Sequence, residues 1–381
     1  MNRQTVFTNA RMVLPDRVLS GSLCIEGDTI TAIDSAPSGV TGAIDLNGDF
    51  LLPGLIELHT DNLEKHFTPR PGVKWPELPA IFGHDSVVAS AGITTVFNAV
   101  ATGNVLPDST RSERFDHMVG AIREAAASNI TRAEHLLHIR CELTCDSTLE
   151  KFSNWMDDPL LRLVSVMDHS PGQRQFVNLD KYREYYRGKY KLSEREMEKL
   201  IAHHTDISQR FGRAHRSEIA RLCHERGVAM ASHDDATLEH VRESVEDGMS
   251  IAEFPTTVAA ARSSREHGLH VMMGAPNVVR GFSHSGNVSA REMAAEGLLD
   301  TLSSDYVPES LLHSAFILAE HVAHIELPEA VNMISRNPAR AAGLHDRGEI
   351  ALGKRADLVQ VTRLDHSPVV RQVWRQGQRV A

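Results

Sequence analysis

The sequence predicts an α/β fold: a (β/α)8, TIM-like barrel with a small β domain that both ends of the chain form together. Three observations lead to this fold class. Short β-rich runs separated by Gly, Asp and Pro fill residues 1–50, and the same texture returns in residues 344–381. Between these ends, strand-like apolar runs alternate with segments whose apolar residues recur at helical spacing. Residues 51–343 hold eight such units, which is the size and rhythm of a (β/α)8 barrel.

The eight expected barrel strands are apolar runs bounded by polar or turn residues. Segments such as RSERFDHMVGAIREAAAS and RSEIARLCHERG lie between them and have helical periodicity. An open, doubly wound sheet is the alternative arrangement, but no glycine-rich phosphate-binding motif follows the first strand. The expected strands cover residues 51–61, 92–100, 135–143, 161–169, 228–235, 250–256, 270–277 and 300–306.

Composition and charge limit the classes of function. The 381 residues carry a formal net charge of -10, which argues against a general nucleic-acid binder. No apolar run approaches the roughly 20 residues needed to span a bilayer, and no secretory leader is evident, so we expect a cytoplasmic protein. The cysteines form no CxxC pair and are expected to be reduced thiols. They are Cys24, Cys141, Cys145 and Cys223.

The first expected barrel strand, LLPGLIELHTD, ends abruptly in polar residues. A buried strand has no need of an imidazole and a carboxylate at its end, and both are costly to bury without partners. Side chains alternate along a strand, so His59 and Asp61 project from the same face and can hold one ion between them. The alternative is a helix start with a polar cap.

Other expected strands end in the same kinds of residue. In (β/α)8 barrels the active site lies at the carboxyl ends of the strands. Imidazole and carboxylate ligands without thiolate suit a catalytic site for one or two divalent ions, of zinc, manganese or iron. Glu142 has two oxygens and can bridge two ions, and Asp305 can act as general base. For any single residue, a capping or core role is the alternative. The candidate metal ligands are His59, Asp61, Glu142, His169, His233 and Asp305.

These features together resemble the amidohydrolase superfamily. The first motif there is usually H-x-H, and Asp61 is a departure from it. Longer motifs are similar to those of the PhnM-type α-D-ribose 1-methylphosphonate 5-triphosphate diphosphatases of the carbon-phosphorus lyase pathway. The resemblance implies hydrolysis of that triphosphate to the 5-phosphate and pyrophosphate in phosphonate catabolism. The motifs are ELHTDNLEKHFTPRPGVKWP, MDHSPGQRQF, KYREYYRGKY, SHDDAT, EFPTT, GAPNVVRGFSHSGN and LSSDY.

A triphosphate substrate also requires cations outside the metal site. The segment KYREYYRGKY, residues 181–190, contains four of the five tyrosines and follows the fourth strand and its loop. We interpret it as an anion-binding lid, a mobile loop that orders around the substrate, and the alternative is a solvated basic helix face. The loop GAPNVVRGFSHSGN has a composition suited to phosphate oxygens. The candidate substrate contacts are Arg70, Lys74, Arg174, Arg183, Arg187, Lys189, Arg280 and His284.

Two rival functions remain open at this point. One is hydrolysis of a C–N bond, in a cyclic amide or an N-acyl sugar, which predicts a less cationic barrel mouth. The other is a barrel scaffold without catalysis, which would need none of the five ligand-type strand ends. The expected partner is a small anionic substrate rather than nucleic acid or a membrane, and homo-oligomerisation is left open.

Overall fold

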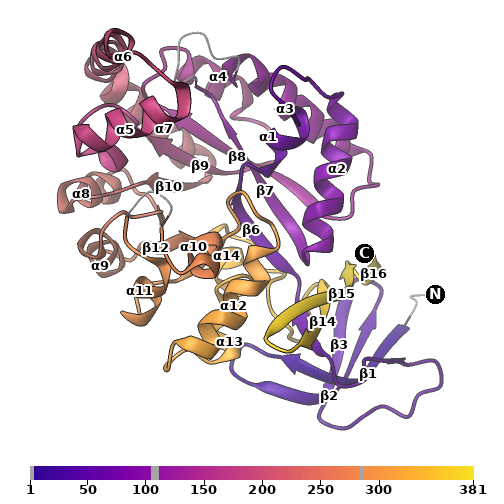
Figure 1. Cartoon of the computed structure of the whole chain (residues 1–381). Helices are drawn as coiled ribbons and strands as arrows, with labels where there is room; N and C mark the ends of the chain where they lie inside the picture. The colour runs from indigo at the N-terminus through magenta and orange to yellow at the C-terminus, as the bar shows by residue number, and fades with distance from the viewer. Residues whose placement is uncertain (1–3, 104–110, 284–286) are drawn as a thin grey trace. The chain divides into compact units, whose positions relative to one another are not determined.

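The computed structural model describes residues 4–103, 111–283 and 287–381 (Figure 1). The chain divides into two compact units. Unit 1 comprises Met1–Asn98, Ala121–Leu136 and Met273–Ala381, and unit 2 comprises Ala99–Gly120 and Leu137–Met272. Within the described ranges, no helix has the length and apolar character needed to cross a membrane.

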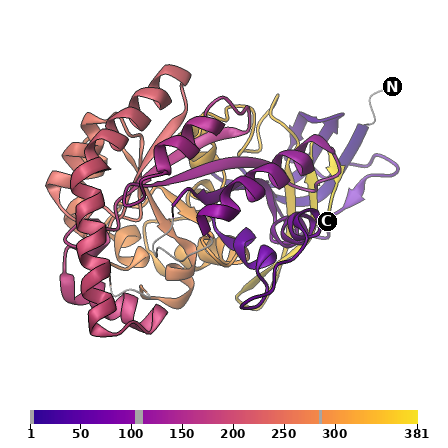
Figure 2. The ribbon, with the colours of Figure 1, turned by 90° about the horizontal axis from the view of Figure 1, so that it is seen from above.

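A mixed sheet in unit 1 combines strands from both ends of the chain, and its pairings are antiparallel except for those of β1 with β4 and β5 (Figure 2). Its order is β16-β15-β14-β5-β1-β2-β3, and β4 pairs with β1. The late strand β14 pairs with β5 from Leu358 opposite Pro53 to Val361 opposite Phe50. This confirms that the two ends build one β structure. The strands are β1 (Gln4–Val13), β2 (Val18–Glu26), β3 (Thr29–Asp34), β4 (Ile44–Asp45), β5 (Phe50–Pro53), β14 (Leu358–Leu364), β15 (Ser367–Arg375) and β16 (Gln378–Arg379).

The proposed domain boundaries, residues 1–50 and 344–381 around 51–343, stay a prediction, and β5 runs across the first of them. Apolar side chains from both chain ends share the core of this sheet. Phe7 and Trp374 meet edge to face with ring centroids 4.9 Å apart. Met12, Leu23 and Leu358 are buried in the same cluster.

Eight strands form the second sheet, a parallel one ordered as in the chain. An isolated parallel bridge joins Thr60, at the end of β6, to Asp305, just after β13, so the first and last strands meet. This confirms the predicted (β/α)8 barrel, and each of the eight expected runs holds one barrel strand. The first run, residues 51–61, was wrongly taken as a single strand, because it also includes most of β5 of the other sheet. The strands are β6 (Leu55–Thr60), β7 (Ile93–Ala101), β8 (Glu134–Glu142), β9 (Leu161–Met167), β10 (Ala229–His233), β11 (Ile251–Glu253), β12 (His270–Gly274) and β13 (Thr301–Ser303).

Two helices, α8 and α9, begin within five residues of the strands that precede them. After β10 and β11, the side chains of Thr237 and Thr257 cap the next helices by accepting from the backbone N–H of His240 and Ala260. These caps keep the connections after the two strands short. The helices are α1 (Asn62–Phe67), α2 (Glu77–Ser90), α3 (Arg111–Ala127), α4 (Thr148–Trp155), α5 (Leu179–Tyr190), α6 (Glu194–Ile207), α7 (Arg213–Arg226), α8 (Leu238–Glu246), α9 (Val258–Glu266), α10 (Ala275–Arg280), α11 (Ala290–Ala295), α12 (Ser310–His321), α13 (Leu327–Asn332) and α14 (Arg336–Ala341), with a 3-10 turn η1 (Arg174–Phe176) and a π-helical turn η2 (Ser208–Gly212).

The shared core predicts that a late residue stabilises the early strands. Trp374→Ala should lower the free energy of unfolding by about 3–5 kcal/mol, because it removes a large buried ring that packs on Phe7. Leu364→Ala, at a side chain that is 69% exposed, is the control and should change it by less than about 0.5 kcal/mol. Denaturant unfolding measures both. Equal effects of the two substitutions would contradict the shared core.

Candidate metal centre and substrate site

In unit 2, three strand ends bring ligand-type side chains together. Glu142 ends β8, His169 follows β9 and His233 ends β10. His169, His233 and Asp234 each offer one ligand atom, and these three atoms lie within 4.8 Å of one another. Asp234 Oδ2 is 3.5 Å from His233 Nε2 and 3.9 Å from His169 Nε2. The group could hold a metal ion.

Carboxylates orient both imidazoles of this group. His169 Nδ1 lies against Glu142 Oε2, and His233 Nδ1 lies against Glu253 Oε2 at the end of β11. A carboxylate on Nδ1 fixes the tautomer and leaves Nε2 for a metal. Each imidazole therefore presents its Nε2 to Asp234.

The contact between Glu142 and His169 shifts the pKa of both side chains. Burial raises the pKa of Glu142, but His169 and hydrogen bonds from Thr144 outweigh it and lower that pKa to about 2. Burial lowers the pKa of His169, whereas Glu142 and Asp234 raise it, and the net direction is upward. Glu142 is thus a carboxylate that stabilises a protonated or metal-bound imidazole.

Three residues beside strand ends adopt left-handed backbone conformations. Asp234 has φ 58°, Phe254 has φ 56° and Asp305 has φ 53°. Such values are uncommon for residues other than glycine, and a bulky Phe pays more for them than Asp. Strained backbone that persists at the ends of several strands is typical of a functional site.

In unit 1, hydrogen bonds to both main-chain groups of Asp305 join the end of β6 to the residues after β13. The Asp305 N–H donates to the His59 carbonyl at 3.1 Å, and the Asp305 carbonyl accepts from Thr60 Oγ1 at 2.7 Å and from the Asp61 N–H at 3.2 Å. Glu57 is fully buried and accepts from the N–H of His59 at 2.6 Å. Burial raises the pKa of Glu57 to about 7, although hydrogen bonds from Ser304 and His59 oppose the rise.

The structure places Asp61 at the start of a helix, directly after the last residue of β6. Helix α1 does begin at the next residue, Asn62, so Asp61 occupies the N-cap position. Its side chain makes no capping hydrogen bond. The carboxylate therefore has no cap function here, which keeps Asp61 among the candidate ligands.

A buried network of polar side chains in unit 1 extends from Asn62, the first residue of α1, to Asp85 in α2. Because the Asp85 carboxylate accepts, His135 donates to it through Nε2, at 3.2 Å, and accepts from the Asn98 amide through Nδ1, also at 3.2 Å. His84 in turn donates through Nε2 to the Asn98 side-chain oxygen and accepts from the Asn62 amide through Nδ1, each at 3.1 Å. The hydrogen bonds thus run in one direction, from the Asn62 amide to the Asp85 carboxylate. The members of the network are Asn62, His66, His84, Asn98, His135 and Asp85.

The expected lid has a different structure from the mobile loop that we predicted. Residues Leu179–Tyr190 form helix α5, whose Tyr182 and Tyr186 are buried with Phe176. The Tyr182 hydroxyl is 2.9 Å from His204 Nδ1, so it is engaged inside the protein. The prediction of a loop was wrong because the tyrosines recur at i, i+4 and pack as one helix face. Phe176 also contacts the ring of His169, with centroids 6.1 Å apart.

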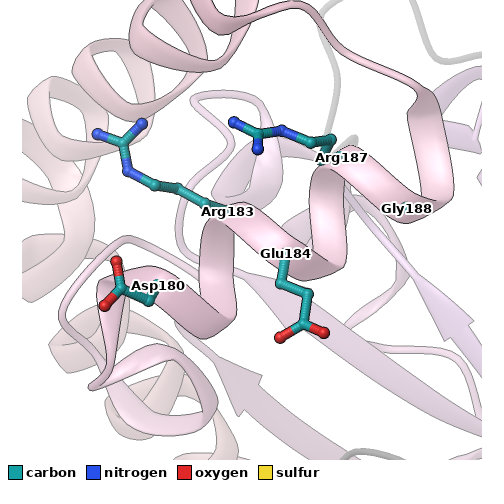
Figure 3. A pocket seen from close by; sticks show the side chains of 5 residues that line it. All are labelled: Asp180, Arg183, Glu184, Arg187 and Gly188. Carbon is teal, nitrogen blue, oxygen red and sulfur yellow. The ribbon is translucent and has the colours of Figure 1, made fainter.

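The opposite face of α5 lines an open hollow of about 450 Å³ (Figure 3). Arg183 and Arg187 point to the same side of the helix, while Glu184 points away from them. Arg183 pairs with Glu194 at 2.9 Å and with Glu198 at 2.6 Å, and Arg187 also pairs with Glu194. Both arginines retain exposed surface. They are available to an anion that can displace the glutamates.

Arg174 lies in a different environment from the other candidate cations. Its side chain is only 3% exposed and pairs with Asp235 and with Glu243 Oε2, the latter at 2.6 Å. Burial and the nearby Arg216 lower its pKa to about 10, although Glu243 opposes the change. The guanidinium is thus committed to two carboxylates and ties η1 to the chain after β10.

The remaining candidate cations belong to unit 1 or fall outside the description. Arg70 and Lys74 are exposed on the segment between α1 and α2. Arg280, at the end of α10, is exposed and stacks over Phe282 with its guanidinium carbon 4.6 Å from the ring centroid. His284 and the side chain of Lys189 lie outside the described residues.

Sequence reasoning missed three carboxylates of the site. Glu253 and Asp234 stand in the motifs EFPTT and SHDDAT, and each lies at or just after a strand end, so their positions carried a signal. Glu57 stands inside an apolar run, two residues before His59. A charged residue in that place on a buried strand is itself a sign of a specific partner.

Comparisons with known proteins identify the class. The model of the Amidohydrolase family matches residues 86–380, and the chain belongs to this family. The alpha-D-ribose 1-methylphosphonate 5-triphosphate diphosphatase of Escherichia coli (strain K12) is 50% identical over 376 residues, covering 98% of this chain and 100% of that enzyme. The resemblance drawn from the motifs is therefore confirmed.

Solved structures agree on the fold. An N-acetylglucosamine-6-phosphate deacetylase from Pasteurella multocida shares 17% identity, with 99% of each chain covered and a TM-score of 0.63. A Xaa-Pro dipeptidase with bound methionine shares 14% identity, with 99% of each chain covered and a TM-score of 0.66. At these identities the likeness supports the architecture alone.

The polar network of unit 1 predicts a loss of stability in acid. Burial, together with His135 and His66, lowers the pKa of His84 well below its ordinary value of 6.5. Below that value the unfolded state binds a proton that the folded state does not, so stability falls as the pH drops. The slope for this one group is up to about 1.4 kcal/mol per pH unit.

Denaturant unfolding at about pH 7.5 and about pH 5.5 checks this prediction. His84→Gln should be less stable at neutral pH but should lose less stability between the two pH values. His345→Gln, at an exposed histidine, is the control and should keep the wild-type pH dependence. An unchanged pH dependence in His84→Gln would remove this residue from the explanation.

Proposed function

We propose that this chain hydrolyses α-D-ribose 1-methylphosphonate 5-triphosphate to the 5-phosphate and pyrophosphate, as a step of phosphonate catabolism. One observation carries the proposal: 50% identity over the full length of a relative that bears the name of this diphosphatase. The imidazole and carboxylate groups of both units fit the metal-assisted hydrolysis that the proposal requires.

The proposed metal centre uses residues that follow barrel strands. In this fold the carboxyl ends of the strands face one mouth. When bound, a divalent ion in such a site lowers the pKa of water to about 7 and stabilises charge on phosphoryl oxygens. Zinc, manganese and iron all suit this donor set, and one or two ions can be held. The proposed ligands are His59, Asp61 and Asp305 in unit 1, and Glu142, His169 and His233 in unit 2, to which we add Asp234.

Asp305 is the proposed general base. Its carboxylate can accept the proton of the attacking water, while its backbone is held by His59, Thr60 and Asp61. The bond that breaks is one of the two P–O bonds of the bridge between the α and β phosphorus atoms. Cleavage of either bond releases pyrophosphate.

Arg183 and Arg187 are the proposed partners of the polyphosphate. They line the hollow of Figure 3, on the helix whose buried face contacts Phe176 and, through it, His169. We propose Arg70, Lys74 and Arg280 as further substrate contacts because they are exposed. Lys189 and His284 remain sequence predictions. Arg174 is left out, because its guanidinium is already paired on both sides.

The function predicts a single-step product pattern. Purified protein with added divalent metal should convert the ribose triphosphate ester to a 5-phosphate and pyrophosphate, which phosphorus NMR distinguishes from stepwise orthophosphate release. Asp305→Asn should lower turnover by at least about 100-fold and retain more of its metal than His59→Ala or His233→Ala, because the amide cannot accept a proton. Orthophosphate as first product, or full activity after exhaustive chelation, would contradict the proposal.

The ion pairs of α5 give the phosphate proposal a sharp test. Alanine at either Arg183 or Arg187 should lower kcat/KM by roughly 10- to 100-fold, and alanine at both by roughly 100-fold or more, because each charge-assisted contact contributes about 1.5–3 kcal/mol. Glutamine at both Glu194 and Glu198 is the control and should lower KM, because it removes the competing carboxylates. Metal content should not change in either variant. Wild-type kinetics in the double alanine variant would leave α5 without a role in binding.

A further inference from the structure

Glu57 is a buried carboxylate that joins the first and last barrel strands. It lies in β6 with no exposed surface. Its Oε1 accepts from the N–H of His59 at 2.6 Å, and its Oε2 accepts from the N–H of Ser304 at 2.5 Å. One side chain thus holds the main chain at two points. One is the proposed ligand His59, and the other is Ser304, directly before the proposed ligand Asp305.

Packing alone does not account for a carboxylate in this place. Its neighbours along the strand, Leu55, Ile56 and Leu58, are apolar and fully buried. An apolar side chain there would avoid the cost of removing a carboxylate from water. It would also leave two buried backbone N–H groups without their acceptor, and such groups are rarely left unsatisfied. The role of the carboxylate is therefore to hold the N–H groups of His59 and Ser304 in place.

Asp305, the residue after Ser304, has an unusual backbone conformation. Its φ of 53° lies in the left-handed region, which is costly for a residue with a side chain. Glu57 fixes the preceding N–H at Ser304, and Thr60 Oγ1 fixes the Asp305 carbonyl at 2.7 Å. The two side chains together hold the turn that directs the Asp305 carboxylate.

We propose that Glu57 is a positioning residue for the metal centre, with Thr60 as its second support, and that it acts by holding His59 and Asp305 at a fixed spacing. This inference rests on the proposed function only in taking His59 and Asp305 as ligands. It predicts an effect on metal affinity that a general loss of stability does not produce. Partners behind metal ligands typically contribute 10- to 100-fold in metal affinity.

The experiment measures metal affinity and thermal stability separately. Glu57→Gln keeps the shape of the side chain but replaces one acceptor with a donor that faces a backbone N–H. Asp357→Asn is the matched control, because Asp357 is also a buried carboxylate of unit 1 that accepts a backbone N–H, from Gln376 at 2.8 Å. Competition with a chromophoric chelator gives the dissociation constant for Mn²⁺ or Zn²⁺, and thermal unfolding without metal gives Tm.

Both variants should have a lower Tm, but only Glu57→Gln should raise the metal dissociation constant, by roughly 10- to 100-fold. Wild-type affinity in Glu57→Gln, equal weakening in both variants, or no metal binding by the wild type would each overturn the inference. Because no substrate is used, failure of the wild type to release pyrophosphate would count against the function and not against this inference.

A second pair of variants decides the matter if Glu57→Gln does not fold. Thr60→Val removes the hydroxyl that donates to the Asp305 carbonyl and nearly preserves the shape, whereas Thr60→Ser keeps the hydroxyl. Metal affinity should fall in Thr60→Val and return towards the wild-type value in Thr60→Ser. Equal affinities in the two variants would overturn the inference.

Discussion

The hydrogen bonds between the end of β6 and the residues after β13 are the constraint on which the proposed site of unit 1 depends. The N–H and carbonyl of Asp305 both bond to β6 or to the residue after it. Glu57 holds the flanking N–H groups of His59 and Ser304. A left-handed aspartate is stable there only because so many contacts determine its conformation. The hydrogen bonds that join the first and last barrel strands therefore also hold the backbone of the proposed base, Asp305.

In unit 2, carboxylate side chains hold the imidazoles of two proposed ligands. Glu142 and Glu253 each bind the Nδ1 of one imidazole, which leaves both Nε2 atoms directed at Asp234. Since a carboxylate behind an imidazole sets its tautomer and its basicity, the ligands are prepared before any ion arrives. The buried aromatic face of α5 packs behind His169 through Phe176, so the helix that carries the arginines also supports a proposed ligand.

The periodicity of the sequence was sufficient for the fold, because each barrel strand is a buried apolar run with its own boundaries. The strand ends also indicated His59, His169, His233 and Asp305. Their partners were harder to predict, since Glu57 owes its role to residues far away in the chain. The pairing of Arg174 was missed for the same reason, because only tertiary contacts decide whether a charge is buried and paired. The conformation of the lid segment was misjudged for a related reason. Its polarity suggested a loop, but packing of its tyrosines against Phe176 makes it a helix.

The insertion of β14 between β5 and β15 has a consequence for how the protein is made. During synthesis the early strands β1 to β5 leave the ribosome long before β14, so β5 has no antiparallel neighbour on that side until the last part of the chain is complete. An open strand edge of this kind can pair with other chains. Contacts of such high sequence separation also slow folding. During synthesis, the edge of β5 that later pairs with β14 is therefore a place where association with other chains can begin.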